Sequence, residues 1–105
     1  MTNKQFISSL RKNYNLGLGL MKRKNKDYAN DLNPFKNFET STLVGVSVEK
    51  AIMVRMLDKF TRAANLLGKD ADVNDEKLED TLLDLMNYTN ILLVWLNSKN
   101  YEKEN

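Results

Sequence analysis

Residues 79–96 read EDTLLDLMNYTNILLVWL, and this stretch decides the fold class. Its apolar residues recur at the three- and four-residue intervals of an α-helix. The helical positions are Leu82, Leu85, Met86, Leu92, Leu93 and Leu96. Negative charge precedes them at Asp75, Glu76 and Glu79, where the dipole of a helix favours it. We therefore expect a long helix that starts near Asn74 or Asp75 and ends near Leu96.

A second helix is expected on the N-terminal side of this stretch, after Gly45. Ser47 is a good N-cap residue, and Glu49 in the first turn suits the helix dipole. The helix should run to Leu67 and stop at Gly68, since glycine is favoured just past a helix end. Its apolar stripe is Ile52, Met53, Met56, Phe60, Ala63, Ala64 and Leu67.

A first helix is expected from about Lys4 to Asp27, because Phe6, Leu10 and Met21 fit the same period. From 28 to 42 the period stops, and turn-forming residues around Pro34 take over. The sequence thus predicts an all-α fold. We expect a helical bundle of three long helices, with a structured loop and an optional short helix between the first two. Residues 1–98 should form a single domain, and residues 99–105 a polar, frayed tail.

The amino-acid composition limits which side chains could catalyse a reaction or bind a metal ion. The 105 residues include no cysteine and no histidine. Disulfides, thiolate metal sites, cysteine nucleophiles and histidine bases are therefore excluded, and catalysis would depend on carboxylates, lysines, tyrosines or an oxygen-bound metal ion. The start MTNKQFISSL does not resemble a signal peptide, and the longest apolar run is too short to cross a bilayer. We expect a cytoplasmic protein, in the host cytoplasm if a phage encodes it, without a membrane partner.

Charge is unevenly distributed along the chain. Residues 1–38 hold eight Lys/Arg against two Asp, whereas residues 39–105 hold eight Lys/Arg against twelve Asp/Glu. The basic cluster at 22–26 is of a kind common at helix C-termini, where it complements the dipole. We expect at most unspecific, salt-sensitive affinity for nucleic acid, and we do not count nucleic acid among the partners.

A polar seam is expected where the second and third helices meet. At helical spacing, one face of the second helix carries Arg55, Asp58, Lys59 and Arg62, and a stripe on the third carries Glu76, Asp80, Asp84 and Asn87. Asp84 stands among apolar neighbours, so it should be at least partly buried and needs a cation, a hydrogen-bond network or a metal.

The seam has two interpretations. In the structural one, Asp80 and Asp84 form salt bridges with the basic residues Arg55, Lys59 and Arg62. In the functional one, carboxylates at Asp58, Asp80 and Asp84 bind Mg²⁺, which prefers few carboxylates, several waters and substrate phosphates. Lys59 and Arg62 then hold those phosphates.

Four segments carry a resemblance to a known family: KNKDY at 24–28, NPFKNF at 33–38, VRMLDKFTR at 54–62 and EDTLLDLMNY at 79–88. Together they resemble nucleotide modification associated domain 1, a family of small phage and bacterial proteins. The chain is more distantly similar to the MazG-like all-α nucleotide pyrophosphohydrolases. That similarity implies Mg²⁺ ligands in EDTLLD, at Glu79 or Asp80 and at Asp84. The first acidic motif of those enzymes is absent, since Asp58 is the only carboxylate in the middle of the second helix.

These observations favour a nucleotide-binding protein of phage type, with Mg²⁺-dependent pyrophosphohydrolysis as the most concrete activity. Asp58 and Asp84 are the candidate catalytic residues, and Asp58, Asp80, Asp84 and Glu79 the candidate metal ligands. The candidate nucleotide-binding residues are Lys24, Asn25, Tyr28, Phe35, Asn37, Phe38, Arg55, Lys59, Arg62, Asn87 and Tyr88. The loop aromatics Phe35 and Phe38 either stack on a base or pin the loop to the core.

Two alternatives stay open. One is a non-catalytic protein that sequesters a signalling nucleotide to counter host defence. The other is a helical interaction module whose charged seam is purely structural. By analogy with other all-α proteins, we expect a homo-oligomer, a dimer or larger.

Overall fold

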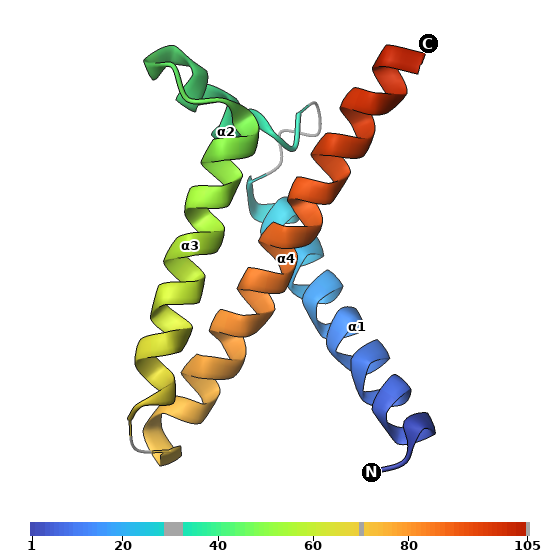
Figure 1. The fold of residues 1–105 in the computed structure, drawn as a ribbon, viewed down its shortest axis with the longest axis vertical. Helices are drawn as coiled ribbons and strands as arrows, with labels where there is room; N and C mark the ends of the chain where they lie inside the picture. Colours follow the sequence, from blue (N-terminus) through green and yellow to red (C-terminus); the bar gives the residue numbers. More distant parts are fainter. Residues whose placement is uncertain (29–32, 70, 105) are drawn as a thin grey trace. The chain divides into compact units, whose positions relative to one another are not determined.

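The computed structural model describes residues 1–28, 33–69 and 71–104 (Figure 1). Its elements are α1 (Asn3–Tyr28), α2 (Lys36–Glu39), the 3₁₀ helix η1 (Thr40–Val44), α3 (Val48–Leu67) and α4 (Ala71–Glu104). No strand occurs in the described part of the chain, so the all-α prediction is confirmed. The chain divides into two compact units, Met1–Pro34 and Phe35–Asn105. All three long helices are present, and the bundle that would join them stays a prediction.

The first unit consists mainly of α1. Thr2 and Gln5 form a reciprocal capping box at its start: the Gln5 backbone N–H donates to Thr2 Oγ1 at 3.1 Å, and the Thr2 backbone N–H donates to Gln5 Oε1 at 2.8 Å. These bonds satisfy donors that the first helical turn leaves unpaired. The helix therefore begins at Asn3, close to the expected start.

The second unit opens with the segment expected to be a structured loop. It contains α2 and η1 in direct succession, so the optional short helix is present. The Ser41 hydroxyl oxygen lies 2.6 Å from the carbonyl oxygen of Phe38 and 2.9 Å from that of Val46, which ties the two ends of η1 together. Gly45 ends η1 with a φ of 79°, in the left-handed region that glycine adopts without steric cost.

Helix α3 follows the predicted boundaries. The Lys50 backbone N–H donates to Ser47 Oγ at 3.3 Å, which confirms Ser47 as the N-cap. The helix ends at Leu67, before Gly68. Its buried residues are Val48, Ile52 and Ala63, and Ile52 is completely inaccessible to solvent.

Helix α4 is longer than the sequence pattern indicated. It begins at Ala71 rather than near Asn74, and it continues to Glu104 through the segment expected to be a tail. Residues 97–104 contain neither glycine nor proline, so no residue there breaks the helical backbone. No described helix has an apolar stretch that could cross a membrane.

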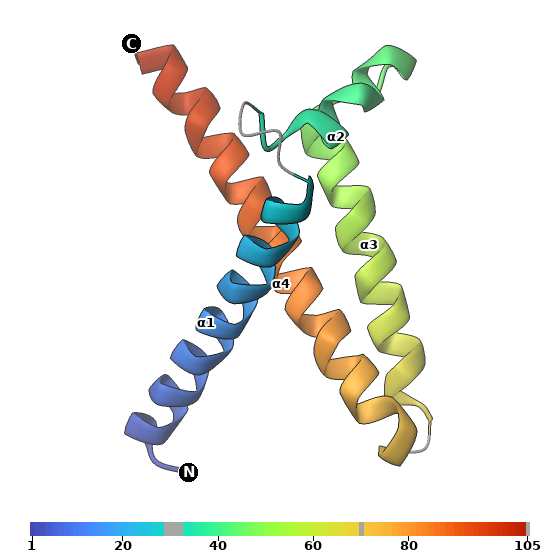
Figure 2. The same ribbon diagram turned by 180° about the vertical axis from the view of Figure 1, so that it is seen from behind.

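Helices α3 and α4 form an antiparallel hairpin (Figures 1 and 2). Both views show the two helices close together at the turn and farther apart toward α2. Small side chains lie where the helices are close: Ala63 and Thr81 are both buried. Toward the open end the space is spanned by larger side chains, chiefly Trp95 and Glu49.

Candidate functional site

The predicted seam forms across the α3–α4 interface. Lys59 Nζ lies 3.1 Å from Asp84 Oδ2, and the side chains of these residues are 30% and 20% exposed. One turn closer to the hairpin turn, Arg62 Nε–H donates to Thr81 Oγ1 at 3.3 Å. The Thr81 hydroxyl in turn donates to the Lys77 carbonyl oxygen at 2.7 Å. Asp84 is therefore partly buried and meets a cation, as expected, and the cation belongs to the chain itself.

The other candidate carboxylates do not gather around Asp84. Asp58, Glu79 and Asp80 are all exposed. Within residues whose placement is described, no three acidic side chains lie close enough to hold a metal ion. Mg²⁺ binding and hydrolysis stay predictions.

The loop aromatics contact aromatic residues of α4. The rings of Phe35 and Trp95 meet edge to face with centroids 5.0 Å apart, and those of Phe38 and Tyr88 do so at 6.3 Å. Pairs of this geometry stabilise a fold beyond the area they bury. Both phenylalanines are half-buried, so the structure favours a pinned loop over a free stacking platform.

The remaining candidate residues differ in exposure. Lys24, Asn37 and Arg55 are exposed, and Asn87 is 7% exposed. Asn25 and Tyr28 have side chains that lie outside the described residues.

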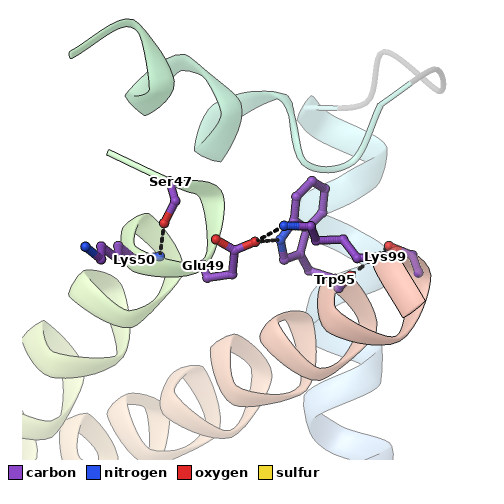
Figure 3. Close-up of polar contacts among 6 residues, drawn as sticks. Ser47, Glu49, Lys50, Trp95 and Lys99 are labelled. Atoms are coloured by element: carbon purple, nitrogen blue, oxygen red, sulfur yellow. Dashed lines mark hydrogen bonds and ion pairs between the residues drawn. The ribbon is translucent and has the colours of Figure 1, made fainter. Parts of the chain in front are cut away.

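A polar cluster at the open end of the hairpin was not among the candidates. Glu49 Oε1 accepts hydrogen bonds from Trp95 Nε1 at 2.6 Å and from Lys99 Nζ at 2.8 Å (Figure 3). The Lys99 ammonium also lies 5.6 Å from the centroid of the Trp95 ring, within range of a cation–π interaction. We call Glu49, Trp95 and Lys99 the Glu49 cluster.

The Glu49 cluster stabilises the ionised carboxylate. The hydrogen bond from Lys99, followed by that from Trp95, lowers the pKa of Glu49 from 4.5 to about 2. The sequence held one signal for it: Trp95 and Lys99 are four residues apart, which places them on the same face of a helix. Lys99 was assigned to the tail, so this signal was missed.

The polar contacts fix the register of the hairpin. From Glu49 to Lys59 the chain advances ten residues along α3, and the partner on α4 moves back eleven, from Trp95 to Asp84. From Lys59 to Arg62 it advances three, and the partner moves back three to Thr81. Leu57 is therefore level with Met86, and Lys50 is level with Val94.

A second surface of the hairpin consists of exposed apolar side chains. They recur at intervals of four, three and seven residues on α3 and of eleven and three residues on α4, which are sums of the four- and three-residue steps of packed helices. The large members are Met53, Leu57, Phe60 and Leu67 on α3 and Leu82, Leu93 and Leu96 on α4, and each is between 41% and 71% exposed. We call these seven residues the apolar face.

Helix geometry places both halves of the apolar face on one side of the hairpin. Each half lies one residue after the stripe that faces the neighbouring helix: Met53 follows the buried Ile52, and Leu82 follows the buried Thr81. One residue turns a right-handed helix by about 100°. Because α3 and α4 run in opposite directions, these two turns bring the side chains to the same side.

The charges of this region lie off the apolar face, except that Lys50 and Glu79 stand at its ends, three residues before Met53 and Leu82. In residues 51–68 and 80–98 the charged residues are Arg55, Asp58, Lys59, Arg62, Asp80 and Asp84. By helical position, each of them belongs either to the α3–α4 interface or to the side of the hairpin opposite the apolar face. We call that opposite side the charged side. From residue 85 to residue 98, α4 has no charged residue at all.

No protein-family model, curated protein or solved structure matches this chain. The resemblance to nucleotide modification associated domain 1 stays a prediction.

Proposed function

We propose that this protein is a helical interaction module, in which the α3–α4 hairpin binds another polypeptide through its apolar face. The observation that carries the proposal is the contrast between burial and exposure. The large side chains of the apolar face are exposed, whereas the buried apolar residues within the described part of the chain are Val48, Ile52 and Ala63. A wide apolar helix surface of this kind is typical of a surface that is covered by another helix.

The free energies of burial and of association indicate what kind of surface the partner needs. Covering the remaining exposed area of seven such side chains would stabilise a complex by roughly 7 kcal/mol. Association itself costs roughly 4–15 kcal/mol in lost translational and rotational freedom. The partner therefore needs an apolar surface of its own, so that both sides of the interface contribute.

The α3–α4 interface supports the same function because its polar groups are used within the chain. Lys59 pairs with Asp84, Arg62 bonds to Thr81, and the Glu49 cluster connects the open ends of the two helices. These contacts hold α3 and α4 in fixed register. They support a role for the seam as a brace for the binding surface.

The proposal is tested by placing charge on the apolar face. The double variant Leu57→Lys/Leu93→Lys should keep the helical circular-dichroism spectrum of the wild type and unfold at a similar urea concentration. It should also lose most binding of a hydrophobic fluorescent dye measured on dilute protein. If the variant is unfolded instead, the apolar face belongs to the chain's own core, and the interaction module is wrong.

A further inference from the structure

We infer that residues 35–46, which we call the strap, open from the α3–α4 hairpin as one piece at a lower cost than unfolding the hairpin, and that opening uncovers Tyr88 and Trp95. The strap comprises Phe35, α2, η1 and the two residues that follow η1. It lies at the open end of the hairpin (Figure 1). The inference concerns contacts within the second unit, and it does not depend on what covers the apolar face.

The strap is held together by hydrogen bonds within itself. The backbone N–H groups of Phe38 and Glu39 donate to the carbonyl oxygen of Phe35, both at 2.9 Å. The backbone N–H of Val46 donates to the carbonyl oxygen of Ser41 at 3.1 Å, and the Ser41 hydroxyl lies against the carbonyl oxygens of Phe38 and Val46. Because these bonds join residues of the strap to one another, they are kept when the strap moves away from α4.

The hairpin side of the contact is formed by the hairpin alone. Trp95 Nε1–H donates to Glu49 Oε1 at 2.6 Å, and the Lys99 ammonium lies 5.6 Å from the centroid of the Trp95 ring. Glu49 belongs to α3, and Trp95 and Lys99 belong to α4. The Glu49 cluster therefore holds the Trp95 ring in place whether or not the strap covers it.

The contact between these two preformed parts is small. Phe35 meets Trp95, and Phe38 meets Tyr88, each through an edge-to-face ring pair. The strap also lies against α3, but neither α2 nor η1 has a buried residue, whereas Ile52 in α3 is completely buried. A segment with few buried contacts opens at a lower free-energy cost than the core to which it is attached. The strap is therefore a lid over the aromatic side chains at the open end.

The first experiment uses Trp95, the only tryptophan of the chain, as a reporter of the strap. Urea unfolding of the wild type is followed by tryptophan fluorescence and by far-UV circular dichroism, which reports mainly on the long helices. Opening of the strap predicts a first change in fluorescence at a lower urea concentration than the loss of helix, since the two probes then follow different events. A single fluorescence transition that coincides with the loss of helix overturns the inference.

The second experiment releases the strap by substitution. Phe35→Ala/Phe38→Ala removes both rings that contact α4. Without urea, this variant should already have the red-shifted Trp95 emission that the wild type reaches after its first change, and its fluorescence and circular dichroism should then change together. It should keep the tryptophan band of the near-UV circular-dichroism spectrum, because Glu49 and Lys99 still hold the ring.

The matched control is Leu43→Ala/Val44→Ala, which truncates two apolar side chains of the same segment that are 87% and 80% exposed. It should keep the emission of the wild type and the separate first change. A control that shifts the emission as much as the double phenylalanine variant overturns the role of the two ring pairs.

Two further outcomes of the phenylalanine variant contradict the inference. If Phe35→Ala/Phe38→Ala lowers the urea midpoint of helix loss as much as Ile52→Ala does, the strap is part of the hairpin core and does not open separately. If the variant keeps its helices but loses the tryptophan band, the Glu49 cluster does not hold Trp95 by itself, and the idea of a preformed surface under the strap is wrong.

Discussion

The two sides of the α3–α4 hairpin differ in where their side chains find partners. On the charged side and at the interface, the cations of Lys59 and Lys99 meet carboxylates of the opposite helix, at 3.1 Å and 2.8 Å. On the apolar face, Leu57 and Phe60 are 62% and 61% exposed. One or two well-placed neighbours are enough to pair a charge, but an apolar surface is stabilised only when a comparable area of another surface covers it. A hairpin of two helices therefore satisfies its polar groups internally and needs a further surface for its apolar ones.

The largest effect should come from the buried interface itself. Ile52→Ala removes a fully buried side chain and should lower the free energy of unfolding by roughly 2–5 kcal/mol. Leu57→Ala, five residues farther along α3, should cost much less in dilute protein because the side chain is already exposed. Urea unfolding at two protein concentrations checks this. The cost of Ile52→Ala should exceed that of Leu57→Ala at both concentrations; equal costs would contradict the distinction between the two surfaces.

The next largest effect is the contribution of the Glu49 carboxylate to stability, which depends on pH. Its pKa in the folded chain is about 2 rather than 4.5, so the unfolded chain binds more protons between these values. The stabilisation by the carboxylate is therefore complete above about pH 4.5 and is lost as the pH falls through 2. Urea midpoints of the wild type and Glu49→Gln should differ clearly at pH 7 and converge near pH 2. A difference that stays constant with pH would show that Glu49 acts through packing alone.

A smaller effect is expected from the ion pair between Lys59 and Asp84. Lys59→Met keeps most of the side-chain volume and removes the charge, and it should cost about 1 kcal/mol because the pair is only partly buried. Arg55→Met is the matched control, since Arg55 is exposed on the same helix. Its effect should stay within about 0.5 kcal/mol. Thermal unfolding in low and high salt should show more screening for the wild type than for Lys59→Met, in which the Lys99–Glu49 pair remains.

The smallest effect is expected from nucleotides. If the seam only braces the hairpin, deoxynucleoside triphosphates with Mg²⁺ should leave the melting temperature unchanged. A ligand at a hundredfold excess over its Kd would stabilise the folded chain by about 2.7 kcal/mol, which a thermal-shift assay detects readily. An increase that Asp84→Asn removes would contradict the structural interpretation of the seam and support the nucleotide-binding prediction.

Local features of the fold could be predicted because they depend on neighbouring residues. Ser47 caps α3 and Gly68 follows its last residue, as expected from the preferences of helix ends. The partly buried position of Asp84 could be predicted from its apolar neighbours. The length of α4 could not, because the absence of helix breakers after Leu96 was a weaker signal than the polar composition of that segment.

The candidate metal ligands show that spacing within one helix does not predict contacts between helices. Asp58, Glu79 and Asp80 were grouped with Asp84 as metal ligands because helical spacing brings residues of one helix to neighbouring faces. Spacing within each helix says nothing of the angle at which the two helices face each other. The structure leaves Asp58, Glu79 and Asp80 exposed, and pairs Asp84 with Lys59.

The sequence by itself determined the helices, their caps and the positions at which charge and apolar side chains recur, because each depends on residues a few positions apart. Only the tertiary structure decided that Glu49 meets Trp95 and Lys99 across 46 and 50 residues of chain. It also decided which apolar stripe of α3 packs on α4 and which faces outward. Both stripes include apolar residues, and they differ by a rotation of about 100° that only helix packing can fix.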